Sequence, residues 1–329
     1  METSTTSCHT LLRIDAEKET HRLVIAIREL VFYQFKRKGA VLGVSGGIDS
    51  SVVAALCARA LGPDHVVALL MPEAESSSDS VVLGRQLASS LGIRSELIDI
   101  TAILEASGCY QHRDQAIRMV FPEYSAGCKC KIALPDLLAR DQFAVFSVVV
   151  QLPSGETKRI RLNLDAYLGI VAASNFKQRS RKMVEYYYAD LLNYAVAGTP
   201  NRLEYELGFF VKGGDGAADF KPIAHLYKSQ VYQLAEYLEI PMEIQQRPPT
   251  TDTYPLEQSQ EEFYFSMPLH KMDLCLYARD HAMPPAETAP IVDLTVEQVH
   301  RAYSMIDRKR ANARYLHMPP VSFAHENPR

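Results

Sequence analysis

The chain has 329 residues, which allows about two domains of average size or one large α/β domain with an insertion. Acidic residues outnumber basic ones by 39 to 35, and the net charge of −4 excludes a protein that relies on a broad basic surface for nucleic acid. Hydrophobic residues make up 47% of the chain and charged residues 22%, as expected for a globular protein with a substantial core.

The sequence carries no signal for a membrane or for export. Its longest apolar run, at 143–150, has only the length of a strand, whereas a membrane-spanning helix needs about 18 consecutive apolar residues. The N-terminus lacks a basic stretch followed by an apolar core, and the six cysteines follow no regular spacing. We therefore expect a cytoplasmic protein with reduced thiols, with neither membrane nor nucleic acid among its partners.

Residues 14–100 alternate between helix and strand patterns. Apolar residues recur at helical spacing over 14–37, with Asp15 as the expected N-cap and Gly39 as the expected stop. The following elements are predicted to be strand 40–44, helix 50–61, strand 65–71, helix 79–91 and strand 94–100. This rhythm predicts an α/β fold with a doubly wound parallel sheet that helices cover on both faces.

Residues from about 105 to 167 break this rhythm and are predicted to form an insertion. Two β-rich runs flank Pro153-Ser154-Gly155, which indicates a β-hairpin. Four residues of the insertion are potential zinc ligands: Cys109, His112, Cys128 and Cys130. The C-x-C spacing of the last two chelates zinc poorly beside C-x2-C, so we interpret these cysteines as free thiols.

The remainder of the chain is mainly helical in pattern. Helices are expected at 168–197, 227–238 and 296–306. Gly198 suits the end of the first, and a strand is indicated from there to about residue 210. Residues 246–260 are predicted to form a loop. We expect a single domain over 1–329, with a helical C-terminal tail at about 291–329.

A glycine-rich turn joins the first strand to its helix, where parallel α/β folds bind ligands. Glycines at this turn allow a tight bend and present backbone N–H groups to a phosphate, and serine hydroxyls add further donors at the N-terminus of a helix. The residues predicted to bind nucleotide phosphates are Gly43, Ser45, Gly46, Gly47, Asp49, Ser50 and Ser51.

Asp49 is unusual in such a turn because its charge repels phosphate. A divalent cation that bridges its carboxylate to the phosphates, such as Mg²⁺, accounts for its presence. No lysine follows the glycines at Walker A spacing. The turn instead resembles the SGGxDS loop of the ATP pyrophosphatases, which cleave ATP between the α- and β-phosphates. A plain Gly-Gly turn with Asp49 as helix cap is the alternative, and the match at five positions disfavours it.

A second segment narrows the choice among enzymes that have this loop. Residues 175–228 contain the blocks NFKQRSR, GTPNRLE, GFFVKGGDGAAD and PIAHLYK in this order. With the loop, these blocks resemble the NAD synthetase family of the ammonia-dependent type over most of residues 20–275. The resemblance implies an adenine nucleotide alpha hydrolase-like fold, and it leaves the insertion and the extreme C-terminus unexplained.

The resemblance implies that Lys228 neutralises ATP phosphates, while Thr199 and Thr250 bond the phosphates or the ribose. Glu204 resembles the second member, with Asp49, of the family's magnesium-binding pair.

Four further residues are implied to serve the other substrates. Arg179, Lys212 and Asp219 resemble contacts to deamido-NAD, whose pyrophosphate attracts cations and whose ribose hydroxyls can donate to a carboxylate. Asp215 is similar to the aspartate near the incoming ammonia, where it would hold or deprotonate ammonium.

The implied reaction is the ATP-dependent amidation of deamido-NAD to NAD by ammonia. It proceeds through an acyl-adenylate and releases pyrophosphate and then AMP. The resemblance also implies a homodimer. Because only about 20 residues precede the apolar core of the first helix, no fused glutaminase is expected, and the ammonia is free or comes from a separate partner.

Some positions depart from the family pattern. Gly213 stands where the family usually has Tyr, and Ala217 where it has Gly. The family's His-Lys-Arg element near the C-terminus is unmatched, with either residues 308–310 or His317 as its substitute. These departures keep open an adenylating amide ligase for another carboxylate. A tRNA-modifying adenylase would want a basic face and paired cysteines, and a non-catalytic nucleotide-binding regulator is the remaining alternative.

Overall fold

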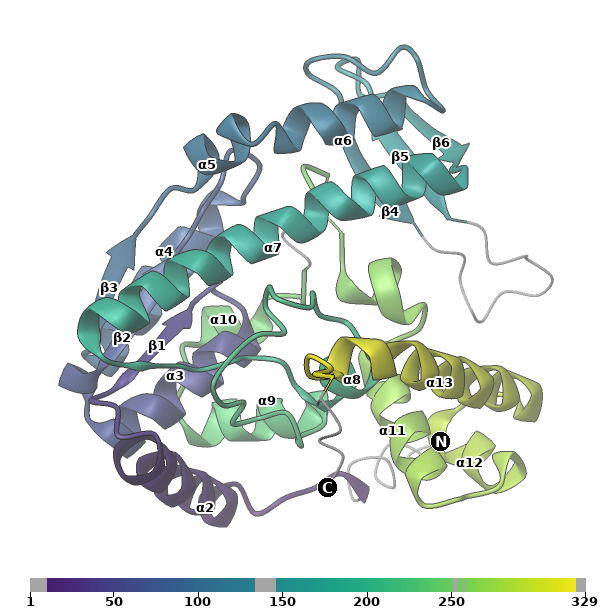
Figure 1. The fold of residues 1–329 in the computed structure, drawn as a ribbon. Coiled ribbons are helices and arrows are strands. Elements are labelled where there is room, and N and C mark those ends of the chain that lie inside the picture. Colours follow the sequence, from purple (N-terminus) through teal and green to yellow (C-terminus); the bar gives the residue numbers. More distant parts are fainter. Residues whose placement is uncertain (1–10, 134–145, 251–253, 257, 324–329) are drawn as a thin grey trace, which may run out of the picture.

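The computed structural model describes residues 11–133, 146–250, 254–256 and 258–323. A parallel sheet with the strand order β3-β2-β1-β7 forms its centre (Figure 1). The strands are β1 (Ala40–Gly43), β2 (Val66–Leu70), β3 (Arg94–Leu97) and β7 (Ala195–Val196). β1 pairs with β2 on one side and with β7 on the other, so its carboxyl end lies in the middle of the sheet edge, where ligands bind in such folds.

Helices cover both faces of this sheet. Ala40 and Leu42 of β1 belong to one buried core, and Val41 between them belongs to a second. The first core includes α2 (Ala16–Arg28), its π-helical extension η1 (Glu29–Gln34), α3 (Ile48–Leu61), α4 (Ser78–Leu91), α9 (Lys228–Tyr237) and α10 (Met242–Gln246). The second includes α5 (Thr101–Ala106), α6 (Cys109–Arg118) and α7 (Leu164–Leu192). The predicted doubly wound sheet is confirmed.

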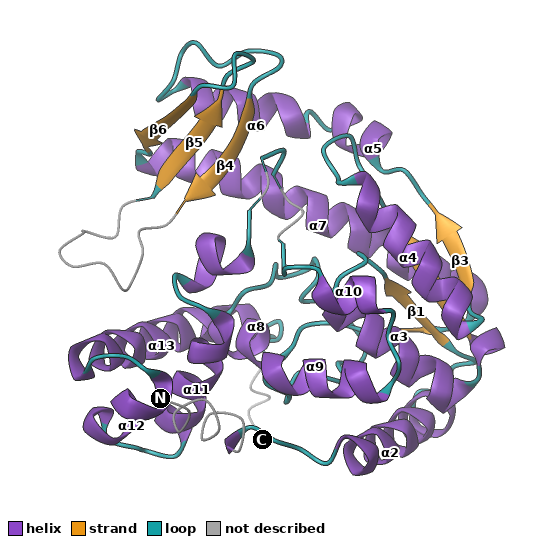
Figure 2. Cartoon of the chain, turned by 180° about the vertical axis from the view of Figure 1, so that it is seen from behind, coloured by secondary structure: helices purple, strands orange, loops and turns teal. Residues whose placement is uncertain are grey.

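The insertion carries a separate antiparallel sheet of order β4-β5-β6. Its strands are β4 (Lys129–Ala133), β5 (Ser147–Gln151) and β6 (Thr157–Arg161). β5 and β6 form the predicted hairpin, with Gly155 at φ 87° in the turn. The sheet packs on α6 and on the N-terminal part of α7, so α7 spans the distance between the two sheets (Figure 2).

The structure corrects two predictions about the segment after α7. The helix begins at Leu164 and ends at Leu192, where Asn193 adopts the left-handed conformation with φ 57°, so it does not continue to Gly198. The strand expected up to about residue 210 is wrong, because α8 (Arg202–Leu207) occupies that stretch. Its capping box joins Asn201 to Glu204, a local signal that the strand prediction overlooked.

The C-terminal helices share a core of their own. α11 (Leu269–Asp280), α12 (Pro285–Val292) and α13 (Val296–His317) pack together with α8 and with the π-helix η3 (Glu261–Phe265). α13 begins where the sequence predicted and runs 11 residues beyond the predicted end at 306. In the part of the chain that the structure describes, no helix is both long and apolar enough to cross a membrane.

Candidate active site

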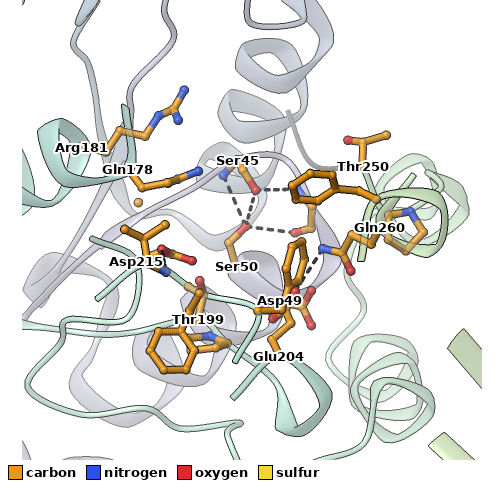
Figure 3. Close-up of a pocket in the computed structure, with 18 of the residues that line it drawn as sticks. Ser45, Asp49, Ser50, Gln178, Arg181, Thr199, Glu204, Asp215, Thr250 and Gln260 are labelled. Atoms are coloured by element: carbon orange, nitrogen blue, oxygen red, sulfur yellow. Dashed lines mark hydrogen bonds between the residues drawn. The ribbon is translucent and has the colours of Figure 1, made fainter. Parts of the chain in front are cut away.

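A cavity of about 600 Å³ lies at the carboxyl ends of β1 and β2 (Figure 3). Its walls come from the glycine-rich turn, from one face of α7, from the segments around α8 and from α13. The predicted site residues that line it are Gly43, Ser45, Gly47, Asp49, Ser50, Thr199, Glu204, Asp215, Lys228 and Thr250. Segments far apart in the sequence therefore meet in one cavity.

The glycine-rich turn holds its shape through its own serines. The Ser50 and Ser51 hydroxyls donate to the carbonyl oxygen of Gly47 at 3.0 and 2.8 Å, and Ser45 Oγ lies 3.4 Å from Ser50 Oγ. Gly46 adopts φ +73°, which favours glycine. Gly46 and Ser51 support the turn from outside the cavity lining, whereas Ser45 and Ser50 line the cavity at the N-terminus of α3.

Three ionisable groups meet beside this turn. Lys228 Nζ forms an ion pair with Asp49, and Asn201 Nδ2 donates to the other carboxylate oxygen of Asp49 at 3.1 Å. Glu204 accepts a hydrogen bond from Gln260 Nε2 at 3.0 Å (Figure 3). Three different helix N-termini thus place one cation and two carboxylates together.

The charges in this group influence one another. Burial, and then the charge of Asp49, raise the pKa of Glu204 to about 8. Burial opposes the charge of Lys228, but Asp49 and Glu204 outweigh it, so the pKa of Lys228 lies above its ordinary value. One lysine therefore balances the two carboxylates only in part, and the site favours a further cation.

Lys228 is held in place by Asp273 from α11. The Asp273 carboxylate accepts the backbone N–H groups of Lys228 and Ser229 at 3.1 and 2.7 Å, and this caps the N-terminus of α9. Asp273 is fully buried, and burial raises its pKa to about 6. The sequence gave no indication of this contact, because 45 residues separate the partners.

A second carboxylate pair lies where α7 passes the end of β1. Asp215 lines the cavity and accepts the backbone N–H of Val211 at 2.8 Å, while burial raises its pKa. Glu185, which the sequence analysis missed, also lines the cavity and pairs with Lys182 at 2.6 Å. Burial raises the pKa of Glu185 as well. Raised pKa values favour groups that exchange protons near neutral pH.

The three residues assigned to deamido-NAD do not line this cavity. Arg179 Nε donates to the carbonyl oxygen of Lys212 at 3.2 Å. Lys212 Nζ donates to the carbonyl oxygen of Tyr315 at 2.9 Å, and the exposed Asp219 accepts the backbone N–H of Val196 at 2.7 Å. Arg179 and Lys212 are thus close to each other, and all three bond to backbone groups.

Lys309 is the residue of the C-terminal candidates that faces the cavity. Its Nζ lies 3.1 Å from the centre of the Tyr264 ring and donates to the Tyr264 carbonyl oxygen at 2.8 Å. Burial, and then the charge of Arg308, lower the pKa of Lys309 to about 7. Arg310 instead pairs with Glu206. Other lining residues that the sequence analysis missed are Gln178, Arg181, Arg247 and Gln260.

The cysteines of the insertion do not form a metal centre. Among the described residues, no group of three or more His, Cys, Asp or Glu side chains could hold a metal ion. Cys109, Cys128 and Cys130 are free thiols, and Cys109 and Cys130 are buried.

Comparison with known proteins agrees with this geometry. The sequence model of the NAD synthase family matches residues 19–127 and 158–314. The NH(3)-dependent NAD(+) synthetase of Mesorhizobium japonicum is 54% identical over 311 residues, which cover 94% of this chain and 98% of that protein. The enzyme of the same name from Thermotoga neapolitana is 36% identical and covers 80% of this chain and 84% of its own length.

Two solved structures share the fold. The NH3-dependent NAD synthetase from Campylobacter jejuni, in complex with the nitrate ion, has a TM-score of 0.62 and 25% identity, and the match covers 95% of this chain and all of that one. The NMN synthetase from Francisella tularensis has a TM-score of 0.66 and 21% identity over 94% of this chain and 99% of its own. At that identity the second likeness shows the fold alone.

Proposed function

Because the chain belongs to the NAD synthase family, we propose that it converts deamido-NAD to NAD with ATP and ammonia. The observation that carries this is the meeting of Asp49, Lys228 and Glu204 beside the glycine-rich turn, at the carboxyl end of the central strand. That arrangement suits a nucleotide triphosphate whose α-phosphate is attacked.

In the first step, a carboxylate oxygen of deamido-NAD attacks the α-phosphorus of ATP. The bond to the β-phosphate oxygen breaks, pyrophosphate leaves, and an acyl-adenylate forms. The backbone N–H groups at the start of α3 and the Lys228 ammonium face the phosphates, and Lys228 offsets the charge that develops on the leaving group. Adenylation is needed because a carboxylate is a poor electrophile.

In the second step, ammonia attacks the acyl carbon of the adenylate. The carbon–nitrogen bond forms, AMP leaves, and the nitrogen must give up a proton. Asp215 lines the cavity with a raised pKa, so we assign it the binding of ammonium and the acceptance of this proton. Glu185 lies close enough to Asp215 for the two charges to interact, which keeps a proton available to the pair.

Asp49 and Glu204 are the residues that would hold Mg²⁺. They fit because they are two carboxylates incompletely balanced by Lys228, and the pKa of Glu204 reaches about 8 as a result of burial and of Asp49. Magnesium prefers one or two protein carboxylates and takes its remaining ligands from phosphate and water. When bound, it would neutralise phosphate charge. Without it, Asp49 still orients Lys228 through their ion pair.

We also propose a homodimer that forms across α7. Exposed apolar side chains recur every four residues at both ends of this helix: Leu164, Leu168, Met183, Tyr187 and Leu191. A second copy related by a two-fold axis would cover such a surface, and Arg179 on the same helix would meet deamido-NAD beside it. Light scattering of wild type and Tyr187→Glu measures this; a monomeric wild type would contradict it.

The decisive test of the proposed function is pyrophosphate release with ATP, Mg²⁺, ammonium and deamido-NAD. Wild type should release pyrophosphate and form NAD in equal amounts. Asp49→Ala should lower both by at least about a hundredfold, the scale for losing a group that stabilises transition-state charge. Asp79→Ala, an exposed carboxylate in the first turn of α4, is the matched control and should retain full activity.

The same assay separates the alternatives. Pyrophosphate release that ignores deamido-NAD but responds to another carboxylate would identify an amide ligase for a different substrate. Retention of tRNA at low salt would identify a tRNA-modifying adenylase. The cytoplasmic location and the ammonia source remain predictions, as does the single domain over 1–329 with its insertion and C-terminal tail.

A further inference from the structure

One face of α7 runs along the whole cavity. The residues of α7 that line it are spaced three or four apart, as neighbours on one face of a helix are: Tyr167, Val171, Ser174, Asn175, Gln178, Arg181 and Glu185. At the rise of an α-helix, the path from the first to the last measures about 27 Å. The cavity is therefore long, and its two ends are lined by different parts of the molecule.

The Glu185 end belongs to the nucleotide phosphates. A side-chain carbon added at Gly43 would meet Glu185 Oε1 at 3.0 Å, so Glu185 lies against the carboxyl end of β1. Arg181 Nε donates to the carbonyl oxygen of Met71, just after β2, at 3.1 Å. The phosphate-binding turn begins at the same strand end, which places the reacting α-phosphate here.

The Tyr167 end belongs to the inserted sheet. Phe146, just before β5, stacks on Tyr167 with ring centres 4.2 Å apart and an angle of 28° between the rings. Ile132 of β4 lies beside them in the lining. Residues 128–157, which supply Phe146 and Ile132, fall outside the match to the NAD synthase family. This end of the cavity is thus a feature that the family match does not explain.

The described part of the insertion is firmly built. Ile132 pairs with Val148 across the β4–β5 ladder, and both are buried in the core that the sheet shares with α6 and α7. Gln258 Nε2 donates to the carbonyl oxygen of Ile132 at 2.5 Å, which ties the segment before η3 to the edge of β4. Rigid support of this kind is what a binding surface for a planar ring requires.

We propose that Phe146 and Tyr167, with Ile132 beside them, form the subsite for the purine ring of the carboxylate substrate. This assignment rests on the proposed function, because the nicotinate carboxylate of deamido-NAD must reach the α-phosphate at the Glu185 end. The purine half of the dinucleotide then extends along α7 toward the insertion. Aromatic side chains bind such a ring by stacking on its face. The subsite makes the enzyme favour a dinucleotide over nicotinate mononucleotide, which lacks the purine.

Steady-state kinetics of Phe146 variants test this subsite. Phe146→Leu keeps an apolar side chain but removes the ring, and Phe146→Tyr restores the ring. We expect Phe146→Leu to raise the KM for deamido-NAD about tenfold, within the range for the loss of one stacked base. The KM values for ATP and ammonium should stay within about twofold, and Phe146→Tyr should match wild type. Phe323→Leu, at a side chain 93% exposed, is the matched control.

Competition by nicotinate mononucleotide gives a second readout that is independent of turnover. Its inhibition constant against deamido-NAD should be the same in wild type and Phe146→Leu, since it has no purine to stack. Unchanged KM values in Phe146→Leu, or equal rises for ATP and deamido-NAD, would overturn the subsite. A wild-type protein that forms no NAD would instead contradict the proposed function, so the two failures are distinguishable.

Discussion

Replacing Asp273 by alanine should disturb the active site from a position outside its lining. Its carboxylate accepts the N–H groups of Lys228 and Ser229 at the start of α9, and it is fully buried. Alanine leaves both donors buried without an acceptor. The N-terminal turn of α9 is then free to shift, and the Lys228 ammonium moves with it, away from Asp49.

The size of the effect follows from these two hydrogen bonds. A buried donor left without a partner costs about 1–3 kcal/mol, and loss of a helix cap typically about 1 kcal/mol. Removing a buried carboxylate offsets part of this cost, so we expect Asp273→Ala to lower the free energy of unfolding by about 2–4 kcal/mol. For a chain of this length, that corresponds to a fall in Tm of about 4 °C. Asp273→Asn keeps one acceptor and should lose about half as much.

Thermal unfolding and kcat, both measured well below Tm, are the assays. The kcat of Asp273→Ala should fall at least about tenfold, since Lys228 no longer faces the leaving group. Asp307→Ala removes an exposed carboxylate that pairs with Arg279 and is the matched control; it should change stability by less than about 1 kcal/mol. If Asp273→Ala retained both the Tm and the kcat of wild type, the cap would not hold Lys228.

The pH dependence of stability provides a further check on Asp273. Burial raises its pKa to about 6 in the folded protein, from an ordinary value of 3.8. The folded state therefore binds the proton more tightly, and the stability from this group is present at low pH and is lost as the pH rises through 6. The advantage of wild type over Asp273→Asn should shrink between about pH 4 and 7. An advantage that grew with pH would have the wrong sign.

Three other substitutions have defined outcomes. Lys177→Met removes the buried cation that pairs with Glu73 at 2.9 Å and Glu75 at 2.7 Å, and it should lower stability by about 3–5 kcal/mol in urea unfolding; a loss below 1 kcal/mol would show that the carboxylates need no partner. Gly46→Ala places a side-chain carbon 3.0 Å from α4 at φ +73° and should raise the KM for ATP several-fold, so an unchanged KM would contradict it. Lys309, whose pKa is about 7, loses its charge above that pH, so the KM for an anionic nucleotide should rise between about pH 6 and 8 in wild type and stay flat in Lys309→Arg; parallel profiles would exclude its contact with the nucleotide.

Local patterns in the sequence were sufficient for the frame of the site. The glycine-rich turn, with Asp49 two residues beyond its second glycine, needs a strand before it and a helix after it, and the structure has β1 and α3 there. Alternating strand and helix patterns specified a parallel sheet, because such a rhythm leaves few other ways to bury both faces. Glu204 and Lys228 were found through their place in family blocks, and both line the same cavity.

Errors arose where short-range preferences gave way to contacts or to local caps. The stretch after Gly198 was predicted as strand, yet the capping box of Asn201 and Glu204 starts a helix there. α7 was predicted to continue to Ala197, but residues 195–196 pair with β1 instead. A two-residue strand has too little pattern of its own to be recognised, since its partner strand defines it.

By itself, the sequence determined the phosphate-binding turn, the α/β class and the family, because these depend on residues close together in the chain or on ordered blocks. Only the tertiary structure decided which side chains share the cavity. Asp273 reaches Lys228 from another helix, Lys309 faces the site while Arg310 turns to Glu206, and Phe146 meets Tyr167 at the far end of α7. Such contacts depend on how helices pack, and spacing along the chain does not encode them.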